Sequence, residues 1–259
     1  MRCPLSITGI VCAAVLLASC TAPAPPPPAA SPSPAPVGKA GVPPAPVATA
    51  PLPTSTPSPS PTPTGVWTAL GGAAGLARPQ GIAVDAQGNI YVADSPNDRV
   101  VKLSPAGAVL ATWGGSGDAP GEFNAPVGLA VDREGNVYVV DAFNDRIQKL
   151  SPSGAPLAQW GVWGLGPGEF DSPFGLALDA QGNVYVADTG NSRVQKLSAD
   201  GKPLAQWGAR GSGPGQFAGP TGVAVDGQGN VYVADTENNR IQKLSPAGQP
   251  LAQWGAAGK

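Results

Sequence analysis

Four aspartates at regular intervals are the residues of this chain that could do chemistry. Asp85, Asp132, Asp179 and Asp226 lie 47 positions apart. Hard cations take clustered carboxylate oxygens, so a ring of these side chains could hold a metal ion. Each aspartate also stands three residues before a Gly-Asn pair, where an Asp side chain caps a turn. Because the aspartate recurs in every unit, we expect turn capping and predict neither a bound metal nor a cofactor.

A second set of carboxylates recurs with an arginine five positions later. The pairs are Asp94 with Arg99, Asp141 with Arg146, Asp188 with Arg193, and Asp235 with Arg240. Across a short hairpin, this spacing lets the carboxylate reach the guanidinium through charge-assisted hydrogen bonds. We therefore predict one structural ion pair per unit, in preference to a ring of arginines that grips an anion.

Side chains that break the repeat are better candidates for a binding role. The second unit has Ala-Phe143-Asn where the others have Ser-Pro-Asn, Thr-Gly-Asn and Thr-Glu-Asn. The connection after it carries Trp163 and Leu165, where other connections carry polar residues that include Asp118 and Arg210. Exposed apolar clusters mark interaction sites, so these five residues are the partner-binding candidates. The alternative is that Trp163 folds back onto the glycines of its own loop.

The elements that position these residues are four repeated units of 47 residues, over about 76–114, 123–161, 170–208 and 217–255. In the second unit, residues 128–132, 136–141, 146–151 and 156–160 are strand candidates, separated by short segments with turn residues. Glycine-bearing connections of three to five residues are hairpin signals, so each unit is predicted to be a four-stranded antiparallel meander.

The apolar pattern indicates how the meanders pack. The second strand, NVYVVD in the second unit, is almost continuously apolar, as strands covered on both faces are. A radial array of twisted four-stranded sheets supplies that environment, and units of 40 to 50 residues fit one blade each. We therefore predict an all-β fold, a β-propeller, over residues 65–259.

The repeated phrases resemble a known family. Pro-x-Gly-x-Ala-Val-Asp, Gly-Asn-Val-Tyr-Val-Ala-Asp, Asn-x-Arg-Ile-Gln-Lys-Leu and the lead-in Gly-Pro-Gly-Glu/Gln-Phe are similar to NHL repeats across residues 76–255. The resemblance implies a propeller whose relatives mostly serve as binding platforms for proteins and in some cases RNA, while a few related propellers are lyases or lactonases. Familiar NHL propellers have six blades, and this chain has four units.

The number of units raises the question of ring closure. An open array leaves the apolar faces of its end units bare, and end repeats are usually polar for that reason. Here the end units are nearly the same as the inner ones. We expect four blades to close into a ring; the alternative is a homodimer that completes a larger ring. Residues 66–70 (VWTAL) form a further strand candidate that could seal the seam.

The front of the chain differs in composition. Residues 1–20 combine Arg2, an apolar stretch and Leu-Ala-Ser-Cys20, which resembles the lipobox of bacterial lipoprotein signal peptides and implies a lipid on Cys20. Residues 21–64 contain 17 prolines and a single charge, Lys39, which is typical of a disordered linker. Cys3 and Cys12 lie inside the expected signal, so no disulfide framework is predicted after processing.

Charge and composition narrow the function. The net charge is −2, there is no histidine, and no stretch concentrates Lys and Arg, so nucleic acid is not an expected partner. Without histidine or a free thiol, the usual nucleophile–base arrangement is missing, and we predict that the chain is not an enzyme. We expect a membrane-anchored lipoprotein of the extracytoplasmic cell envelope that binds a protein or cell-wall polymer. The alternative is a carboxylate-metal-dependent hydrolase or lactonase.

Overall fold

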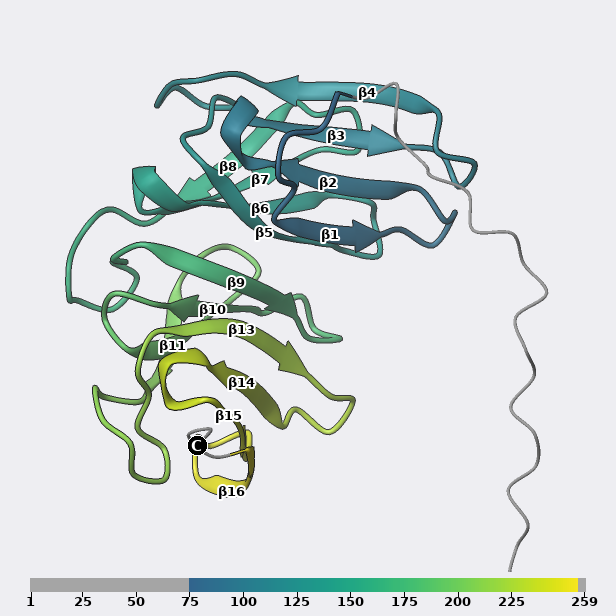
Figure 1. Ribbon diagram of the computed structural model, residues 1–259. Coiled ribbons are helices and arrows are strands. Elements are labelled where there is room, and N and C mark those ends of the chain that lie inside the picture. Colours follow the sequence, from purple (N-terminus) through teal and green to yellow (C-terminus); the bar gives the residue numbers. More distant parts are fainter. Residues whose placement is uncertain (1–74, 256–259) are drawn as a thin grey trace, which may run out of the picture. The chain divides into compact units, whose positions relative to one another are not determined.

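The computed structural model describes residues 75–255, which form four antiparallel sheets (Figure 1). Each sheet holds four strands in chain order, and we call the sheets blades 1 to 4. Blade 1 holds β1 (Gly81–Val84), β2 (Ile90–Asp94), β3 (Arg99–Leu103) and β4 (Val109–Gly114), and blade 2 holds β5 (Pro126–Val131), β6 (Val137–Asp141), β7 (Arg146–Leu150) and β8 (Pro156–Trp160). Blade 3 holds β9 (Pro173–Leu178), β10 (Val184–Asp188), β11 (Arg193–Leu197) and β12 (Pro203–Trp207), and blade 4 holds β13 (Pro220–Val225), β14 (Val231–Asp235), β15 (Arg240–Leu244) and β16 (Pro250–Gly255).

The predicted all-β class with four-stranded antiparallel blades is confirmed. Between residues 75 and 255 the helical segments are single 3-10 turns, η2 (Ser95–Asn97), η3 (Ala142–Asn144) and η4 (Thr236–Asn238). None of the helical segments in this part of the chain has the length and apolar character needed to cross a membrane.

Neighbouring blades pack through their inner strands and through the two faces of each sheet. β1 lies against β5, β5 against β9, and β9 against β13. Between blades 2 and 3, Tyr138 and Ile147 share one apolar cluster with Val184, Val186 and Leu197. A sheet with a neighbour on each side is covered on both faces, which explains why the second strands are continuously apolar.

Glycines let the inner strands approach closely. A Cβ atom on Gly81 would fall 2.0 Å from the carbonyl oxygen of Val127, one residue before the equivalent glycine of the next blade. Gly128 meets the carbonyl of Phe174 in the same way at 2.3 Å. Because backbone atoms cannot move aside as side-chain ends can, only glycine fits at this position of an inner strand.

The expected closure into a four-bladed ring is wrong for the described residues. Ile82 of blade 1 is 69% exposed, whereas its equivalent in blade 2, Leu129, is 6% exposed. Ile241 of blade 4 is 40% exposed, whereas Ile147 is fully buried. Three junctions join the four blades, and the outer faces of blades 1 and 4 have no neighbouring blade among the described residues. The physical reason is the angle between successive blades, which is set by the packing of large side chains and leaves the first and last sheets apart (Figure 1).

Several sequence-based predictions fall outside the described residues. These are the signal peptide with its lipidation site at Cys20, the proline-rich linker over 21–64, and the strand candidate at 66–70. They remain predictions, as do the domain boundaries drawn at 20 and 64.

Candidate functional site

The two ends of the blades differ in character. One end carries the turns between first and second strands and between third and fourth strands, and we call it the turn face. The other end carries the turns between second and third strands and the connections from each blade to the next, and we call it the loop face. The repeated aspartates of the first strands lie on the turn face, and the other predicted site residues between 75 and 255 lie on the loop face.

On the turn face, each aspartate of the first set caps its turn. Oδ1 of Asp85 accepts hydrogen bonds from the backbone N–H groups of Gln87 at 3.0 Å and Asn89 at 2.8 Å. Its Oδ2 accepts from Asn89 Nδ2 at 2.8 Å and from the Tyr91 hydroxyl at 3.1 Å. Asp132, Asp179 and Asp226 cap their turns through the same backbone and Asn donors. These carboxylates therefore hold the hairpins in shape.

Hydrogen bonds of this kind lower the pKa of three of these carboxylates, Asp85, Asp179 and Asp226. Burial is the largest single influence on the pKa of Asp85 and Asp179 and raises it, but the hydrogen bonds from the Asn side chain, the two backbone N–H groups and the Tyr hydroxyl together outweigh burial and lower the pKa below its usual value. For Asp226, the bond from the Asn230 side chain is the main cause and lowers the pKa to about 2. Among residues 75–255, no group of three or more His, Cys, Asp or Glu side chains is gathered as a metal site would require.

A polar cavity of about 510 Å³ opens on the turn face between blades 2 and 3. Its walls include Asp132, Tyr138, Lys149 and Asp179. The Lys149 ammonium lies 3.6 Å from Asp132 Oδ2 and 4.9 Å from the centre of the Tyr138 ring. Lys149 is thus paired with Asp132, and Asp179 pairs in the same way with Lys196 at 3.5 Å.

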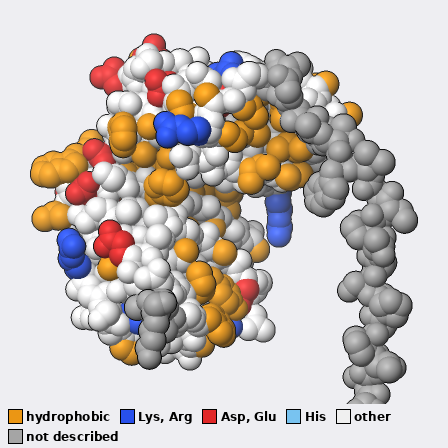
Figure 2. Space-filling model, viewed as in Figure 1, with side chains coloured by type: hydrophobic (Ala, Val, Ile, Leu, Met, Phe, Trp, Pro, Cys, Tyr) orange, Lys and Arg blue, Asp and Glu red, His pale blue; other side chains and the backbone are white. Residues whose placement is uncertain are grey.

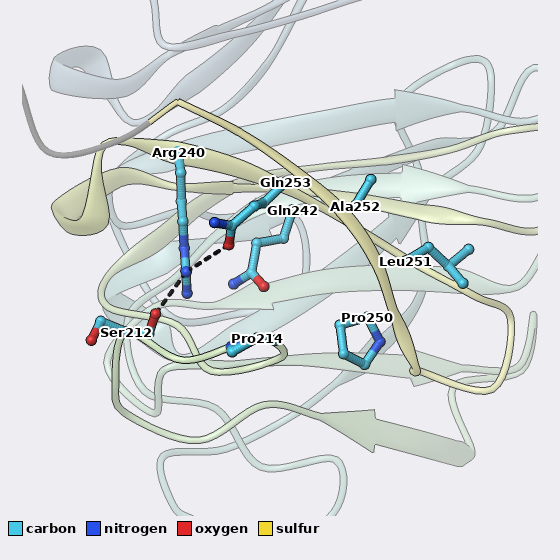
Figure 3. Close-up of a pocket in the computed structure, with 8 residues that line it drawn as sticks. All are labelled: Ser212, Pro214, Arg240, Gln242, Pro250, Leu251, Ala252 and Gln253. Atoms are coloured by element: carbon cyan, nitrogen blue, oxygen red, sulfur yellow. Dashed lines mark hydrogen bonds between the residues drawn. The ribbon is translucent and has the colours of Figure 1, made fainter.

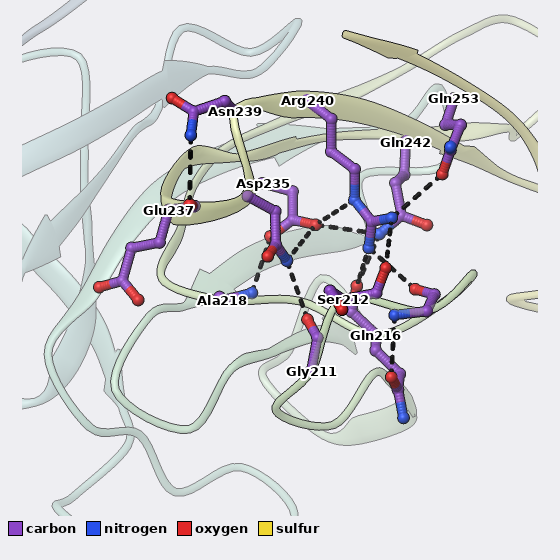
Figure 4. Close-up of polar contacts among 12 residues, drawn as sticks. Gly211, Ser212, Gln216, Ala218, Asp235, Glu237, Asn239, Arg240, Gln242 and Gln253 are labelled. Carbon is purple, nitrogen blue, oxygen red and sulfur yellow. Dashed lines mark hydrogen bonds and ion pairs between the residues drawn. The ribbon is translucent and has the colours of Figure 1, made fainter. Parts of the chain in front are cut away.

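On the loop face, each Asp–Arg pair forms a buried hub. In blade 4, Arg240 Nε donates to Asp235 Oδ2 at 2.7 Å (Figure 4). Oδ1 of the same aspartate accepts from the backbone N–H of Ala218 at 2.7 Å. The equivalent Nε–Oδ2 distances are 2.7 Å for Arg99 and Asp94, 2.7 Å for Arg146 and Asp141, and 2.6 Å for Arg193 and Asp188.

The arginines also hold the connections between blades. The terminal nitrogens of Arg240 donate to the carbonyl oxygens of Ser212, Gly213 and Gln216, at 2.7, 2.8 and 2.9 Å. These carbonyls belong to the connection between blades 3 and 4. The arginine therefore ties its own hairpin to the loop that enters the blade.

Sequence reasoning missed a buried glutamine beside each of the last three arginines. Gln242 Nε2 donates to the Gln216 carbonyl at 2.6 Å and to Asp235 Oδ2 at 3.2 Å, and its Oε1 accepts from Gly215 N at 2.9 Å. Gln148 and Gln195 occupy the same positions and are buried. The 47-residue spacing of these glutamines could have indicated a structural role. A polar residue two positions after an arginine in a strand is, however, normally expected to face solvent.

The outermost strand of each of these blades borders a shallow pocket. The largest, about 370 Å³, lies on blade 4 between Pro214 of the connection and Pro250, Leu251 and Gln253 of β16 (Figure 3). Equivalent pockets of about 210 and 290 Å³ lie at Pro120 and Pro167. A pocket that recurs with the repeat follows from the architecture and does not distinguish one blade as a site.

The connections between blades share one backbone conformation and differ in what they display. Parallel bridges join Ser116 to Phe123, Trp163 to Phe170, and Arg210 to Phe217. The first residue of each pair, and the one two positions later, occupy equivalent places in the three connections. Asp118 and Arg210 are exposed at these places, as are Trp163 and Leu165. The scaffold is therefore constant, and the side chains at these two positions give each connection its own chemistry.

The apolar residues that break the repeat project into solvent. Phe143, Trp163 and Leu165 are 70%, 72% and 75% exposed, and Val162, which precedes Trp163 in the chain, is also exposed. We call these four residues the aromatic patch. Trp163 therefore does not fold back onto its loop. Figure 2 shows hydrophobic side chains protruding over the connection between β8 and β9, at the left edge of the view.

Hydrogen bonds hold the backbone beneath the aromatic patch. Arg193 donates to the Leu165 carbonyl at 2.6 Å, and Asn191 Nδ2 donates to the Gly164 carbonyl at 2.8 Å. The backbone N–H of Phe143 donates to the Asn124 carbonyl at 3.1 Å. The backbone beneath the patch is therefore held in place before a partner binds. This reduces the conformational entropy that is lost on binding.

Comparison with known families identifies the repeat. The family model for the NHL repeat matches residues 76–103, 170–197 and 217–244. Three of the four units therefore match the NHL repeat. The equivalent stretch of the second unit, which contains Phe143, is not among the matched segments, although blade 2 has the same four strands.

Solved structures with the same fold include enzymes and a binding protein. None of the curated proteins matches the chain. A streptogramin B lyase structure is 17% identical over 69% of this chain and 55% of that chain, with a TM-score of 0.55. A catalytically inactive virginiamycin B lyase from Staphylococcus aureus with quinupristin is 12% identical over 71% and 57%, with a TM-score of 0.54. A nidogen/laminin complex is 24% identical over 70% and 65%, with a TM-score of 0.54. The chain thus spans 55 to 65% of the length of these structures.

The prediction that the chain is not an enzyme is contradicted by these neighbours. Streptogramin B lyase and virginiamycin B lyase share its propeller fold, so this architecture does not imply a protein without catalytic activity. At 12 to 17% identity the likeness shows the fold alone, and it transfers no catalytic residue to this chain.

Proposed function

We propose that this protein binds a protein partner through the loop face, with the aromatic patch as the anchor. The observation that carries the proposal is the exposure of Phe143, Trp163 and Leu165 at positions where the other units have small or polar residues. Aromatic side chains dominate the energy of protein interfaces when a partner removes them from water. Large exposed apolar groups are costly to keep on a protein surface, and an interaction site accounts for them.

The fold of the nidogen/laminin complex supports this class of function. That structure contains a propeller in complex with a protein, at 24% identity to this chain. In our proposal, Asp118 and Arg210 on the flanking connections supply charged contacts at the rim, where charges guide orientation more than they add affinity.

The proposal places the protein in the cell envelope. The lipobox-like segment that ends at Cys20 supports a lipid anchor, and the proline-rich segment over 21–64 supports a spacer between the anchor and the propeller. In this arrangement the loop face meets other components of the extracytoplasmic envelope.

A capture experiment tests the binding role. The full chain is immobilised, exposed to detergent-solubilised envelope proteins, and the retained proteins are identified by mass spectrometry. A double variant, Phe143→Ala with Trp163→Ala, is compared with a control double variant, Leu157→Ala with Leu204→Ala, because these leucines are also exposed but lie on the outermost strands. We expect a protein that wild type and the control retain and the aromatic variant loses. Equal retention by all three chains, or no retention, would contradict the proposal.

A further inference from the structure

The outer face of blade 1 is an apolar surface with no neighbouring blade among the described residues, and we call it the head face. Ile82 and Val84 are exposed on it, Leu76 and Ile90 are half-buried, and Val92 and Leu103 are buried; a groove of about 420 Å³ runs along it. The equivalent residues of blade 2 include Leu129, Val137, Val139 and Leu150, which are buried against blade 1. The head face thus has the side chains of an internal junction but no neighbour among the described residues.

The outer face of blade 4 is the counterpart, which we call the tail face. It consists of Tyr232, Ala234, Ile241 and Trp254, with Gly222 on the inner strand. In the other blades, the residues equivalent to Tyr232, Ala234 and Ile241 are buried, whereas Ile241 itself is 40% exposed. Trp254 is 51% exposed. For Gly222, the only atom within 4 Å of an added Cβ is Ala234 Cβ of its own blade. On the outer side of Gly222, no atom of another blade therefore comes within 4 Å of an added Cβ, whereas on its inner side Gly222 packs against Gly175 of blade 3.

The two faces fit each other because three internal junctions already join surfaces of the same kind. At each junction a tryptophan of one blade lies on a glycine of the next: a Cβ on Gly154 would fall 2.3 Å from Trp113, one on Gly201 2.0 Å from Trp160, and one on Gly248 1.8 Å from Trp207. Gly107 is the equivalent glycine beside the head face and has the same positive φ, 83°. If the two faces met, Trp254 of the tail face and Gly107 beside the head face would stand at the positions of a fourth such contact.

We propose that a second copy of this chain covers both faces, with the tail face of each copy packed on the head face of the other. Two such junctions give a ring of eight blades with two-fold symmetry. A head-to-tail contact closes only if the rotation per unit permits it. A ring of eight blades requires a rotation of one eighth of a turn at every junction, within a chain and between the two copies.

Charge substitution on each face tests the pairing. The mass of the full chain in mild detergent is measured by native mass spectrometry for wild type, Ile82→Glu and Ile241→Glu. Both isoleucines are exposed in the single chain, so these substitutions leave each blade able to fold, which circular dichroism verifies. Leu157→Glu, at an exposed site on the outermost strand of blade 2, is the matched control.

We expect wild type and the control to have the mass of two chains. Each isoleucine variant should have the mass of one chain, even at ten times the concentration at which wild type is paired. A mixture of the two variants regains a pair, because the tail face of one and the head face of the other are intact. A single-chain mass for wild type overturns the proposal, and so does an open series of higher masses. If only Ile82→Glu breaks the pair, two head faces meet each other and the head-to-tail arrangement is wrong.

Discussion

The indole of Trp160 fills the space beside the backbone of Gly201 in the next blade. A Cβ atom on Gly201 would fall 2.0 Å from Trp160 Cδ1, closer than any side chain can approach. The glycine ends the turn between the third and fourth strands of blade 3, where φ is +82°. A turn residue of one blade is therefore part of the junction with the blade before it, and this contact links local turn chemistry to the packing of the array.

This contact makes Gly201→Ala a costly substitution. Gly182 has nearly the same φ, +79°, but a Cβ there meets only Ala199 Cβ at 3.5 Å, which is an ordinary contact. Gly182→Ala should therefore lower the free energy of unfolding by about 1–2 kcal/mol, the cost of a left-handed backbone with a Cβ. Gly201→Ala adds the displacement of the indole and should cost about 3 kcal/mol or more. Chemical denaturation measures both, and equal losses would contradict the role assigned to Trp160.

The buried hub of blade 3 predicts a strong effect of removing its arginine. Arg193→Met leaves the carboxylate of Asp188, which is fully buried, without its cation and frees three loop carbonyls. Breaking a buried ion pair by removing one partner costs about 3–5 kcal/mol. Lys202→Met is the control, because the Lys202–Asp200 pair is exposed and should contribute nothing measurable. Thermal unfolding of both variants decides the matter; a stable Arg193→Met protein would show that the hub is dispensable.

The turn cap in blade 4 predicts a pH dependence. The hydrogen bond from Asn230 lowers the pKa of Asp226 from 3.8 to about 2 in the folded chain. A carboxylate with a depressed folded pKa stabilises the fold above its unfolded pKa, and the contribution is lost as the pH falls toward 2. Carboxyl NMR titration should place Asp226 near pH 2 in wild type and closer to its ordinary value in Asn230→Ala. An unchanged pKa in that variant would refute the capping explanation.

Some of the loop face could be predicted from the sequence because it depends on local geometry. Asp94 and Arg99 are register partners across the hairpin of β2 and β3, and a three-residue 3-10 turn with Asp98 in the left-handed region fixes that register. A spacing of five residues therefore determines which side chains meet. The turn caps follow in the same way from the distance between Asp85 and Asn89.

The extent of the array could not be predicted in this way. Whether four blades close depends on the angle between packed sheets, and that angle arises from side chains on surfaces far apart in the sequence. The residues of the head face have the same apolar pattern as the equivalent residues of the inner blades. The sequence around Ile82 therefore does not show whether another blade covers this face. The buried role of Gln148 was hidden for a similar reason, since its partners come from the connection before its blade.

The exposure of Trp163 is the central claim about function, and hydroxyl-radical footprinting of the full chain tests it most directly. Trp160, three residues earlier, packs on Tyr138 and on the next blade and serves as the internal reference. We predict that Trp163 is oxidised several times faster than Trp160 in the free protein, and that the partner retained by wild type in the capture experiment protects Trp163 alone. Equal oxidation of the two tryptophans, or no protection of Trp163 in the complex, would contradict the proposed binding site.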